Sequence, residues 1–357
     1  MLIRVSTNFP NEPLLRQTPG GRGVWKECRF NLNDPATSDC DIWVVLEGLD
    51  RKERAFVRHG ITIFFALEPP DSESYRPGFL DQFDLVIAAH ADLTHRNVHN
   101  EYQGLPWHVG IDRGALGDQY ARGRPRCTID YDRFAMMPPP AKTGLVSVMV
   151  SAKQLLPGHR NRLRFVEALQ RELGDSLHIF GRGIRPVTDK FDAIAPYRYH
   201  LVLENSTAPH YWSEKLSDSF LGFAYPLYWG CPNIGDYFPE ASLARIDIAE
   251  PAAGIAQVKC ALEADLAGQH RAALLAARAL VLDRYNTFDV IRRACASLPP
   301  RPPRQVTLRP GRHFIPLATK ASYVRHRLTA RIPYARRLKR ALLSLRQRQA
   351  MTTAGDA

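Results

Sequence analysis

Residues 197–206 read YRYHLVLENS, and two short stretches follow them, YWSEK at 211–215 and YPLYWG at 225–230. The apolar run from Tyr199 to Leu203 predicts a buried strand, and residues 225–229 predict a second, shorter one. Between them, Leu216, Phe220 and Phe223 recur at the spacing of one helix face. In a strand, loop, helix, strand unit, the first loop and the helix N-terminus form an anion site at the carboxyl edge of a parallel sheet.

Lys215 falls in the first turn of this expected helix, two residues after Ser213, whose hydroxyl can cap the N-terminus. The helix dipole repels a cation at that position. A phosphate beside Lys215 would explain it. The alternative from spacing alone is a solvated surface lysine, with Glu214 as an ordinary first-turn acid.

The same stretch resembles the donor-binding signature of the fucosyltransferases of glycosyltransferase family 10. That signature has an aromatic-basic-aromatic triplet, an apolar strand ending in E-N-S, then Y-[VI]-T-E-K and P-[IV]-x-x-G. It is matched at 197–199, 203–206, 211–215 and 226–230, with Trp212 in place of an aliphatic residue and Ser213 in place of threonine. Weaker matches lie upstream, at 162–165, 177–183 and 63–70.

The resemblance implies an α/β fold of the GT-B type, with two Rossmann-like domains facing each other across a cleft. It also implies inverting transfer of fucose from GDP-fucose to a hydroxyl of a cell-surface glycan of the lipopolysaccharide or O-antigen type. The donor-binding residues expected on this basis are Arg162, Asn205, Tyr211, Glu214 and Lys215. Arg162 and Lys215 would be fixed cations for the departing diphosphate. Arg160 and Arg164 are alternatives to Arg162.

Glu68 is the expected general base, because it follows an apolar strand at the sheet edge where sites form, and Pro69-Pro70 stiffens the next segment. Without the resemblance, a solvated loop glutamate would be the simpler interpretation. Glu47 and Glu73 are the acidic alternatives for this role.

No metal site is assigned, although stimulation by a divalent metal is left open. Two D-x-D patterns, at 39–41 and 130–132, are interpreted as loop aspartates, because neither follows a long strand. The six cysteines are scattered without a C-x-x-C pair, which favours reduced packing residues.

Four segments are expected along the chain. Residues 1–137 form an N-terminal acceptor-binding α/β domain, with strands at 41–46, 60–67 and 83–88, and residues 138–144 form a Pro-rich linker. The second domain is expected to bind the nucleotide sugar and to have a helix at 160–173 and more helices over 252–282. It spans residues 145–299, and residues 300–357 form a basic amphipathic tail.

The tail carries the net charge of +12, because 14 Lys and Arg lie between Arg301 and Arg348 with no acid before Asp356. Its pattern suits an anionic membrane surface, contacted through residues 320–348. A disordered arm or a nucleic-acid contact is the competing interpretation, and no recognition motif supports it. With no long apolar segment, we expect a cytoplasmic protein held peripherally at the inner face of the membrane.

The sequence therefore favours a glycosyltransferase that uses a nucleotide sugar and a glycan acceptor. Two alternatives stay open at this point. One is the same fold with another nucleotide sugar, and the other is a non-catalytic protein that binds membrane or nucleic acid.

Overall fold

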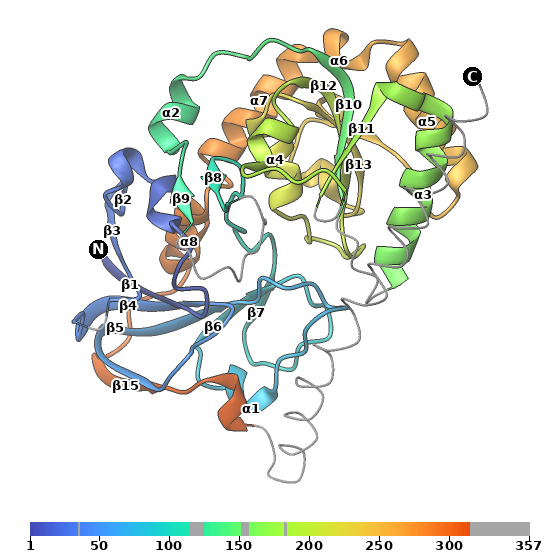
Figure 1. Cartoon of the computed structure of the whole chain (residues 1–357). Helices are drawn as coiled ribbons and strands as arrows, with labels where there is room; N and C mark the ends of the chain where they lie inside the picture. Colours follow the sequence, from blue (N-terminus) through green and yellow to red (C-terminus); the bar gives the residue numbers. More distant parts are fainter. Residues whose placement is uncertain (35, 115–124, 151–156, 182–183, 315–357) are drawn as a thin grey trace, which may run out of the picture. The chain divides into compact units, whose positions relative to one another are not determined.

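The computed structural model describes residues 1–34, 36–114, 125–150, 157–181 and 184–314, and the statements below concern that part of the chain. It contains two mainly parallel sheets (Figure 1), so the predicted α/β class is confirmed. Met1–Pro310 forms one compact unit, separate from Gly311–Ala357. The finer division at 137 and 145 remains a prediction.

The first sheet has the strand order β2-β3-β1-β4-β5-β6-β7, with β15 also paired to β5. Only β2 and β15 run antiparallel to their partners. The predicted strands at 41–46, 60–67 and 83–88 correspond to β4, β5 and β6. The strands are β1 (Leu2–Thr7), β2 (Val24–Trp25), β3 (Cys28–Leu32), β4 (Asp39–Leu46), β5 (Glu53–Phe65), β6 (Leu85–Ala88), β7 (Val98–Asn100) and β15 (Arg304–Leu308).

The second sheet is parallel throughout, in the order β11-β10-β12-β13-β14. Its strands are β10 (Gly144–Met149), β11 (Leu177–Phe180), β12 (Tyr197–Leu203), β13 (Tyr225–Trp229) and β14 (Ala244–Arg245). A separate hairpin joins β8 (Ile111–Asp112) to β9 (Arg126–Cys127). The two strands predicted from the opening stretch are thus β12 and β13, paired in parallel register near the centre of the sheet.

The helices of the first half are few and short in the described residues, so alternation of strand and helix is developed mainly in the second half. The predicted helices at 160–173 and 252–282 are present, the second divided into α5, α6 and α7. The helices are α1 (Pro77–Leu80), α2 (Tyr131–Met136), α3 (Pro157–Leu173), α4 (Glu214–Leu221), α5 (Pro251–Glu263), α6 (Leu266–Gln269), α7 (Arg271–Leu282) and α8 (Thr287–Ala296). Phe223, expected on the face of α4, lies beyond its end with a φ of 54°.

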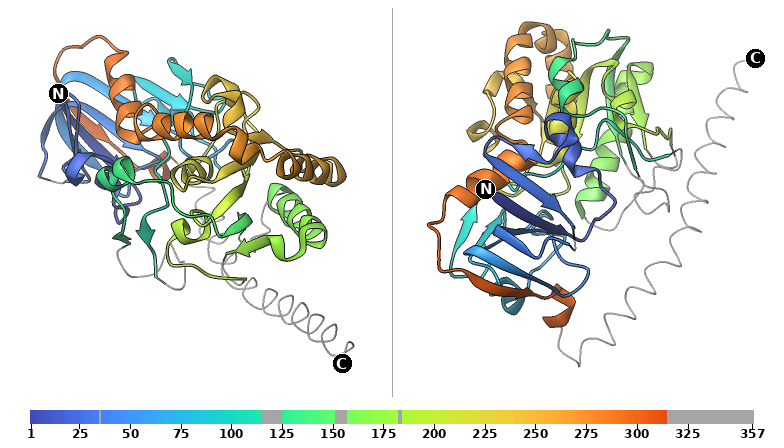
Figure 2. Two further views of the ribbon diagram at one scale, coloured as in Figure 1. Left: turned by 90° about the horizontal axis from the view of Figure 1, so that it is seen from above. Right: turned by 90° about the vertical axis from the view of Figure 1, so that its left-hand side faces the viewer.

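The tail does not begin at residue 300 as expected. Arg304–Leu308 pairs with Glu53–Val57 of β5, and both views of Figure 2 show this orange-red strand beside the blue ones. Pairing satisfies backbone groups that a tail would leave to water. Asp84 fixes the junction, because its buried carboxylate contacts Arg301 and Arg304. Residues 315–357 lie outside the described part.

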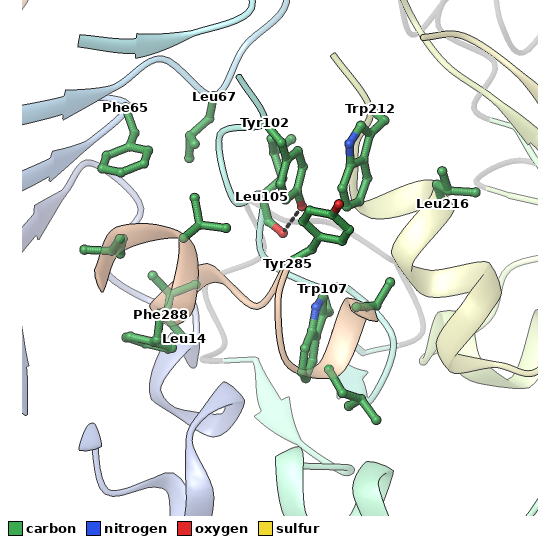
Figure 3. Close-up of a cluster of buried hydrophobic side chains, with 14 of the residues drawn as sticks. Leu14, Phe65, Leu67, Tyr102, Leu105, Trp107, Trp212, Leu216, Tyr285 and Phe288 are labelled. Atoms are coloured by element: carbon green, nitrogen blue, oxygen red, sulfur yellow. Dashed lines mark hydrogen bonds between the residues drawn. The ribbon is translucent and has the colours of Figure 1, made fainter. Parts of the chain in front are cut away.

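One hydrophobic core extends from the first sheet to α4, α7 and α8, and a second lies between β10–β13, α3 and α5. In the first, Tyr102 stacks on Trp212 with ring centroids 3.6 Å apart and 4° between the planes. Figure 3 shows this pair beside Tyr285, which meets both rings edge-on. Trp212, one of the two departures from the family pattern, is therefore a core residue directly in front of α4.

Candidate functional site

The loop that follows β12 begins with a carboxylate that has no exposure to solvent. Glu204 directly follows Leu203, and its backbone N–H donates to the carbonyl of Trp229. Its Oε1 accepts from the backbone N–H of Ser213 at 2.8 Å, and its Oε2 accepts from the Ser213 hydroxyl at 2.7 Å. Glu204 thus ties the carboxyl end of β12 to the N-terminus of α4.

Ser213 caps α4 as predicted, since its hydroxyl accepts from the backbone N–H of Lys215. Lys215 Nζ lies 3.3 Å from Glu204 Oε2, 3.6 Å from Glu214 Oε1 and 3.0 Å from the Ser213 hydroxyl. Burial disfavours the charge on Lys215, but Glu214 and Glu204 outweigh it and raise the pKa of the ammonium above its ordinary value. Carboxylates of the protein itself therefore compensate the cation that the helix dipole opposes.

Arg162 on α3 is buried at the same sheet edge, whereas Arg164 on that helix is exposed. One terminal nitrogen of Arg162 donates to the carbonyl of Leu203 at 3.2 Å, and its Nε has no hydrogen-bond partner among the described residues. Burial lowers the pKa of Arg162, with Glu204, Glu214 and Tyr211 acting in the opposite direction. The side chain of Arg160 lies outside the described part. Of the two candidates whose side chains are described, Arg162 is the one placed beside Lys215 and its carboxylates.

Tyr211 is 3% exposed and packs against Ala89 and Ala208. Burial raises the pKa of its phenol well above the ordinary range, and the carboxylates of Glu204, Glu214 and Glu68 add to the effect. Tyr211 therefore stays neutral and lies within the electrostatic field of carboxylates from both sheets. Asn205 lies at a partly exposed bend directly after Glu204.

Two glycines at the strand ends allow the close packing of this edge. A Cβ at Gly230 would lie 2.5 Å from Glu204 Cγ and 2.7 Å from the Tyr228 hydroxyl. A Cβ at Gly181, where φ is 145°, would lie 1.8 Å from the carbonyl oxygen of Val150. The glycine that ends YPLYWG is thus required by the burial of Glu204.

Glu68 is exposed, in the loop that leaves β5, and its Oε2 accepts from the Ser72 hydroxyl at 3.1 Å. Three residues further on, Asp71 accepts a hydrogen bond from the Ser206 hydroxyl in the loop after Glu204. The structure therefore brings the loop of the expected base against the loop of the expected donor-binding residues. Glu47, an acidic alternative, has both carboxyl oxygens bonded to this same loop.

Sequence reasoning missed a second polar group around Glu214. Lys190 Nζ lies 3.4 Å from Glu214 Oε1 and 3.3 Å from Asp218 Oδ2, and His108 Nδ1 lies 3.5 Å from Glu214 Oε1. Asp218 also accepts from the backbone N–H groups of His108 and Val109. The carboxyl group of Glu214 is buried, which favours its neutral form, but the ammonium groups of Lys215 and Lys190 hold its pKa well below the ordinary value.

His108 lies beside both Glu214 and Lys190. It is only partly exposed, and burial together with Lys190 holds its pKa well below the ordinary value, so the imidazole is neutral. Lys190 gives no sequence signal, because it is a single cation at the start of a short 3-10 helix (Lys190–Ala193) with no periodic pattern around it.

Both D-x-D patterns have structural partners. Asp41 accepts from the backbone N–H of Leu2 and pairs with Arg58, and this first pattern begins β4 rather than preceding it. Asp130 caps α2, and Asp132 accepts from the N–H of Gly20. Within the described ranges, no group of three His, Cys, Asp or Glu side chains is placed to hold a metal ion. Nor does that part include a helix long and apolar enough to cross a membrane.

Comparison with known proteins finds similarity at the level of fold. No family model and no curated protein matches the sequence. A crystal structure of an alpha1,3-fucosyltransferase with GDP-fucose is 18% identical, covering 76% of this chain and 81% of that one at a TM-score of 0.43. An alpha1,3-fucosyltransferase with GDP is 16% identical, covering 80% and 92% at 0.43.

A third solved structure, TarM of S. aureus with fondaparinux, alpha-GlcNAc-glycerol and UDP, is 8% identical, covering 71% and 55% at a TM-score of 0.38. At these values the likeness concerns the course of the chain and carries nothing about substrate or mechanism. The solved proteins that this chain is similar to include alpha1,3-fucosyltransferases.

Proposed function

We propose that this chain is a glycosyltransferase that uses a nucleotide sugar, with GDP-fucose as the donor. The observation that carries the proposal is the cluster at the carboxyl edge of the second sheet. There, Arg162 and Lys215 lie together beside the N-terminus of α4 and next to Glu204 and Glu214. This arrangement accounts for the residue pattern at 197–230 that resembles the family 10 signature.

The two cations suit a departing diphosphate because they are fixed before the reaction begins. Lys215 is a quarter exposed and is held by ion pairs rather than by a backbone carbonyl. A phosphate oxygen can therefore take the place of one carboxylate on Nζ without unfolding α4. The Nε of Arg162 is a second donor available to an anion.

The proposed reaction is a single displacement with inversion at the anomeric carbon. Glu68 takes the proton of the acceptor hydroxyl, the acceptor oxygen bonds to the anomeric carbon, and the bond from that carbon to the diphosphate oxygen breaks. The diphosphate leaves with the bonding electrons as part of GDP. Support for Glu68 comes from its exposure and from the contact of its loop with Ser206.

A panel of nucleotide sugars tests the proposal by thermal shift and by release of the nucleoside diphosphate in the presence of glycan acceptors. We expect GDP-fucose and GDP to stabilise the protein, because a ligand stabilises only the fold that binds it. Arg162→Ala should lose most of this stabilisation. Arg164→Ala, an exposed position on the same helix, is the matched control and should keep it.

Stabilisation by a different nucleotide sugar would keep the enzyme class and change the donor. No response to any nucleotide sugar, with salt-sensitive binding of DNA instead, would refute the proposal in favour of a binding protein. The acceptor that we propose is a hydroxyl of a lipopolysaccharide or O-antigen glycan.

We also propose that the chain works in the cytoplasm at an anionic membrane, through the basic segment 320–348. That segment lies outside the described residues, and its composition alone supports this part of the proposal.

A further inference from the structure

The segment that carries Glu68 runs from the end of β5 to Tyr75 and is short and rich in proline. Pro69 and Pro70 stiffen it, and Asp71 fixes its middle to Ser206. Its two ends are fixed by one other side chain, that of Glu47. The proposed function does not use this side chain.

Glu47 directly follows β4 and has a φ of 63°. A residue with a Cβ pays roughly 1 kcal/mol or more for that conformation, which glycine adopts freely. Its Oε2 accepts from the backbone N–H of Leu67 at 2.7 Å and from that of Glu68 at 3.1 Å. The Tyr75 hydroxyl lies 2.8 Å from Oε1 and 2.9 Å from Oε2.

These bonds tie the first and last residues of the segment to one carboxyl group. Tyr75 is fixed in turn by edge-on ring contacts with Phe64 at 5.2 Å and with His90 at 5.3 Å. The bond to the N–H of Glu68 acts on the very residue whose side chain would take the proton. Its effect on the direction of that side chain is therefore immediate.

We propose that Glu47 is a positioning residue, which sets the direction of the Glu68 carboxylate toward the acceptor hydroxyl through the Leu67 and Glu68 amides. The inference rests on the proposed function and deepens it, since it names a residue that acts on the reaction without touching substrate. Near-attack geometry is sensitive to shifts of about 1 Å, which can cost about 100-fold in rate.

The geometry also indicates which substitutions of Glu47 should keep its hydrogen bonds to the loop and which should remove them. In Glu47→Gln, the amide oxygen can accept from both backbone N–H groups while the amide nitrogen donates to the Tyr75 oxygen. In Glu47→Leu, two amides and a hydroxyl lose their acceptor. Glu47→Asp keeps a carboxyl group but is one methylene too short to reach the loop.

The experiment measures three quantities on the full chain: hydrogen exchange at the Leu67 and Glu68 amides, GDP affinity by calorimetry, and kcat with KM for transfer. We expect Glu47→Gln to keep all three within about threefold. Glu47→Leu should exchange both amides at least about 10-fold faster, keep its GDP affinity, and lose about 10- to 100-fold in kcat. Glu263→Leu, the same substitution at an exposed position of α5, is the control and should resemble the wild type.

If Glu47→Leu fails to fold, Glu47→Asp serves in its place with the same expected losses. Unchanged exchange at the two amides, or an unchanged kcat in the variant that folds, would overturn the proposal. The proposal would also be overturned if Glu47→Gln lost as much kcat as Glu47→Leu. The hydrogen bonds that the amide preserves would then not be the cause of the loss. A wild-type protein without transfer would refute the proposed function itself, which separates the two failures.

Discussion

Lys215→Ala removes an ammonium group that forms ion pairs with the carboxylates of Glu204 and Glu214. Glu204 is fully buried, and without Lys215 its carboxylate is left, among the described residues, with the hydrogen bonds from Ser213 and the electrostatic attraction of Arg162. Breaking a buried pair by removing one partner costs about 3–5 kcal/mol. Because Lys215 is 23% exposed and water screens part of the interaction, we expect the lower end, about 3 kcal/mol.

This cost translates into a thermal shift. For the compact unit Met1–Pro310, an unfolding entropy of about 2.1 cal/mol/K per residue makes 3 kcal/mol equal to roughly 5 °C in Tm. A charge-assisted phosphate contact is worth a further 1.5–3 kcal/mol, so the affinity for GDP should fall about 10- to 150-fold.

The double variant Lys215→Ala with Glu204→Gln separates the two effects. Removing the buried charge of Glu204 should restore most of the 5 °C, since the amide still accepts from the N–H of Ser213 and no unpaired carboxylate remains. GDP affinity should stay low. Scanning calorimetry and titration calorimetry measure these quantities, and Glu172→Gln at an exposed ion pair is the control. Recovery of GDP affinity in the double variant would show that Lys215 makes no contact with phosphate, and an unchanged Tm in Lys215→Ala would refute the ion-pair argument.

Further predictions concern the proposed base Glu68, the positioning residue Glu47 and the basic tail. Glu68→Gln should keep its GDP affinity and lose about 10²- to 10⁴-fold in transfer, because the amide cannot take a proton; near-normal turnover in a folded variant would exclude Glu68. Burial raises the pKa of Glu47 to about 8, with Tyr75 and Glu68 as the titratable groups that face it. The native state then holds a proton that the unfolded chain loses above about pH 4.5, so wild-type stability falls as the pH rises through this window. Relative to the wild type, Glu47→Gln should therefore gain roughly 3 kcal/mol of stability between pH 5 and pH 8 in denaturant titrations, and a constant difference would count against a raised pKa. Deleting residues 320–357 should leave transfer in solution intact and abolish flotation with anionic vesicles, and full vesicle binding by the truncated chain would contradict the membrane role.

The sequence was sufficient to predict the elements around the site, because their signals are local. The apolar run at 199–203 and the hydroxyl of Ser213 mark β12 and the start of α4, and both are present. It also predicted a charge next to Lys215, but assigned that charge to a ligand. The structure places Glu204 and Glu214 there. An acid at the end of a buried strand needs a partner, and this rule applied to Glu204 could have identified the pair.

The parts that could not be predicted depend on contacts between distant residues. Lys190 reaches Glu214 from the start of a short 3-10 helix, and the anchoring of the Glu68 segment by Glu47 needs the positions of two strand ends at once. Residues 304–308 read RQVTL, with two apolar side chains inside a basic, Pro-rich segment, so this short stretch gives little local sign of a strand. Only the unpaired edge of β5 makes Arg304–Leu308 a strand.

The pairing of β15 with β5 also bears on how the protein is made. The start of β5, Glu53–Val57, has one neighbour in β4 and the other in β15, which leaves the ribosome about 250 residues later. At typical synthesis rates of about 5–20 residues per second, this edge waits on the order of 10 to 50 seconds for its last strand. The second sheet has all its strands by Arg245 and can form earlier. The first sheet to be synthesised is thus the last to be completed, and until then its open edge is a place where chaperones or other nascent chains can pair.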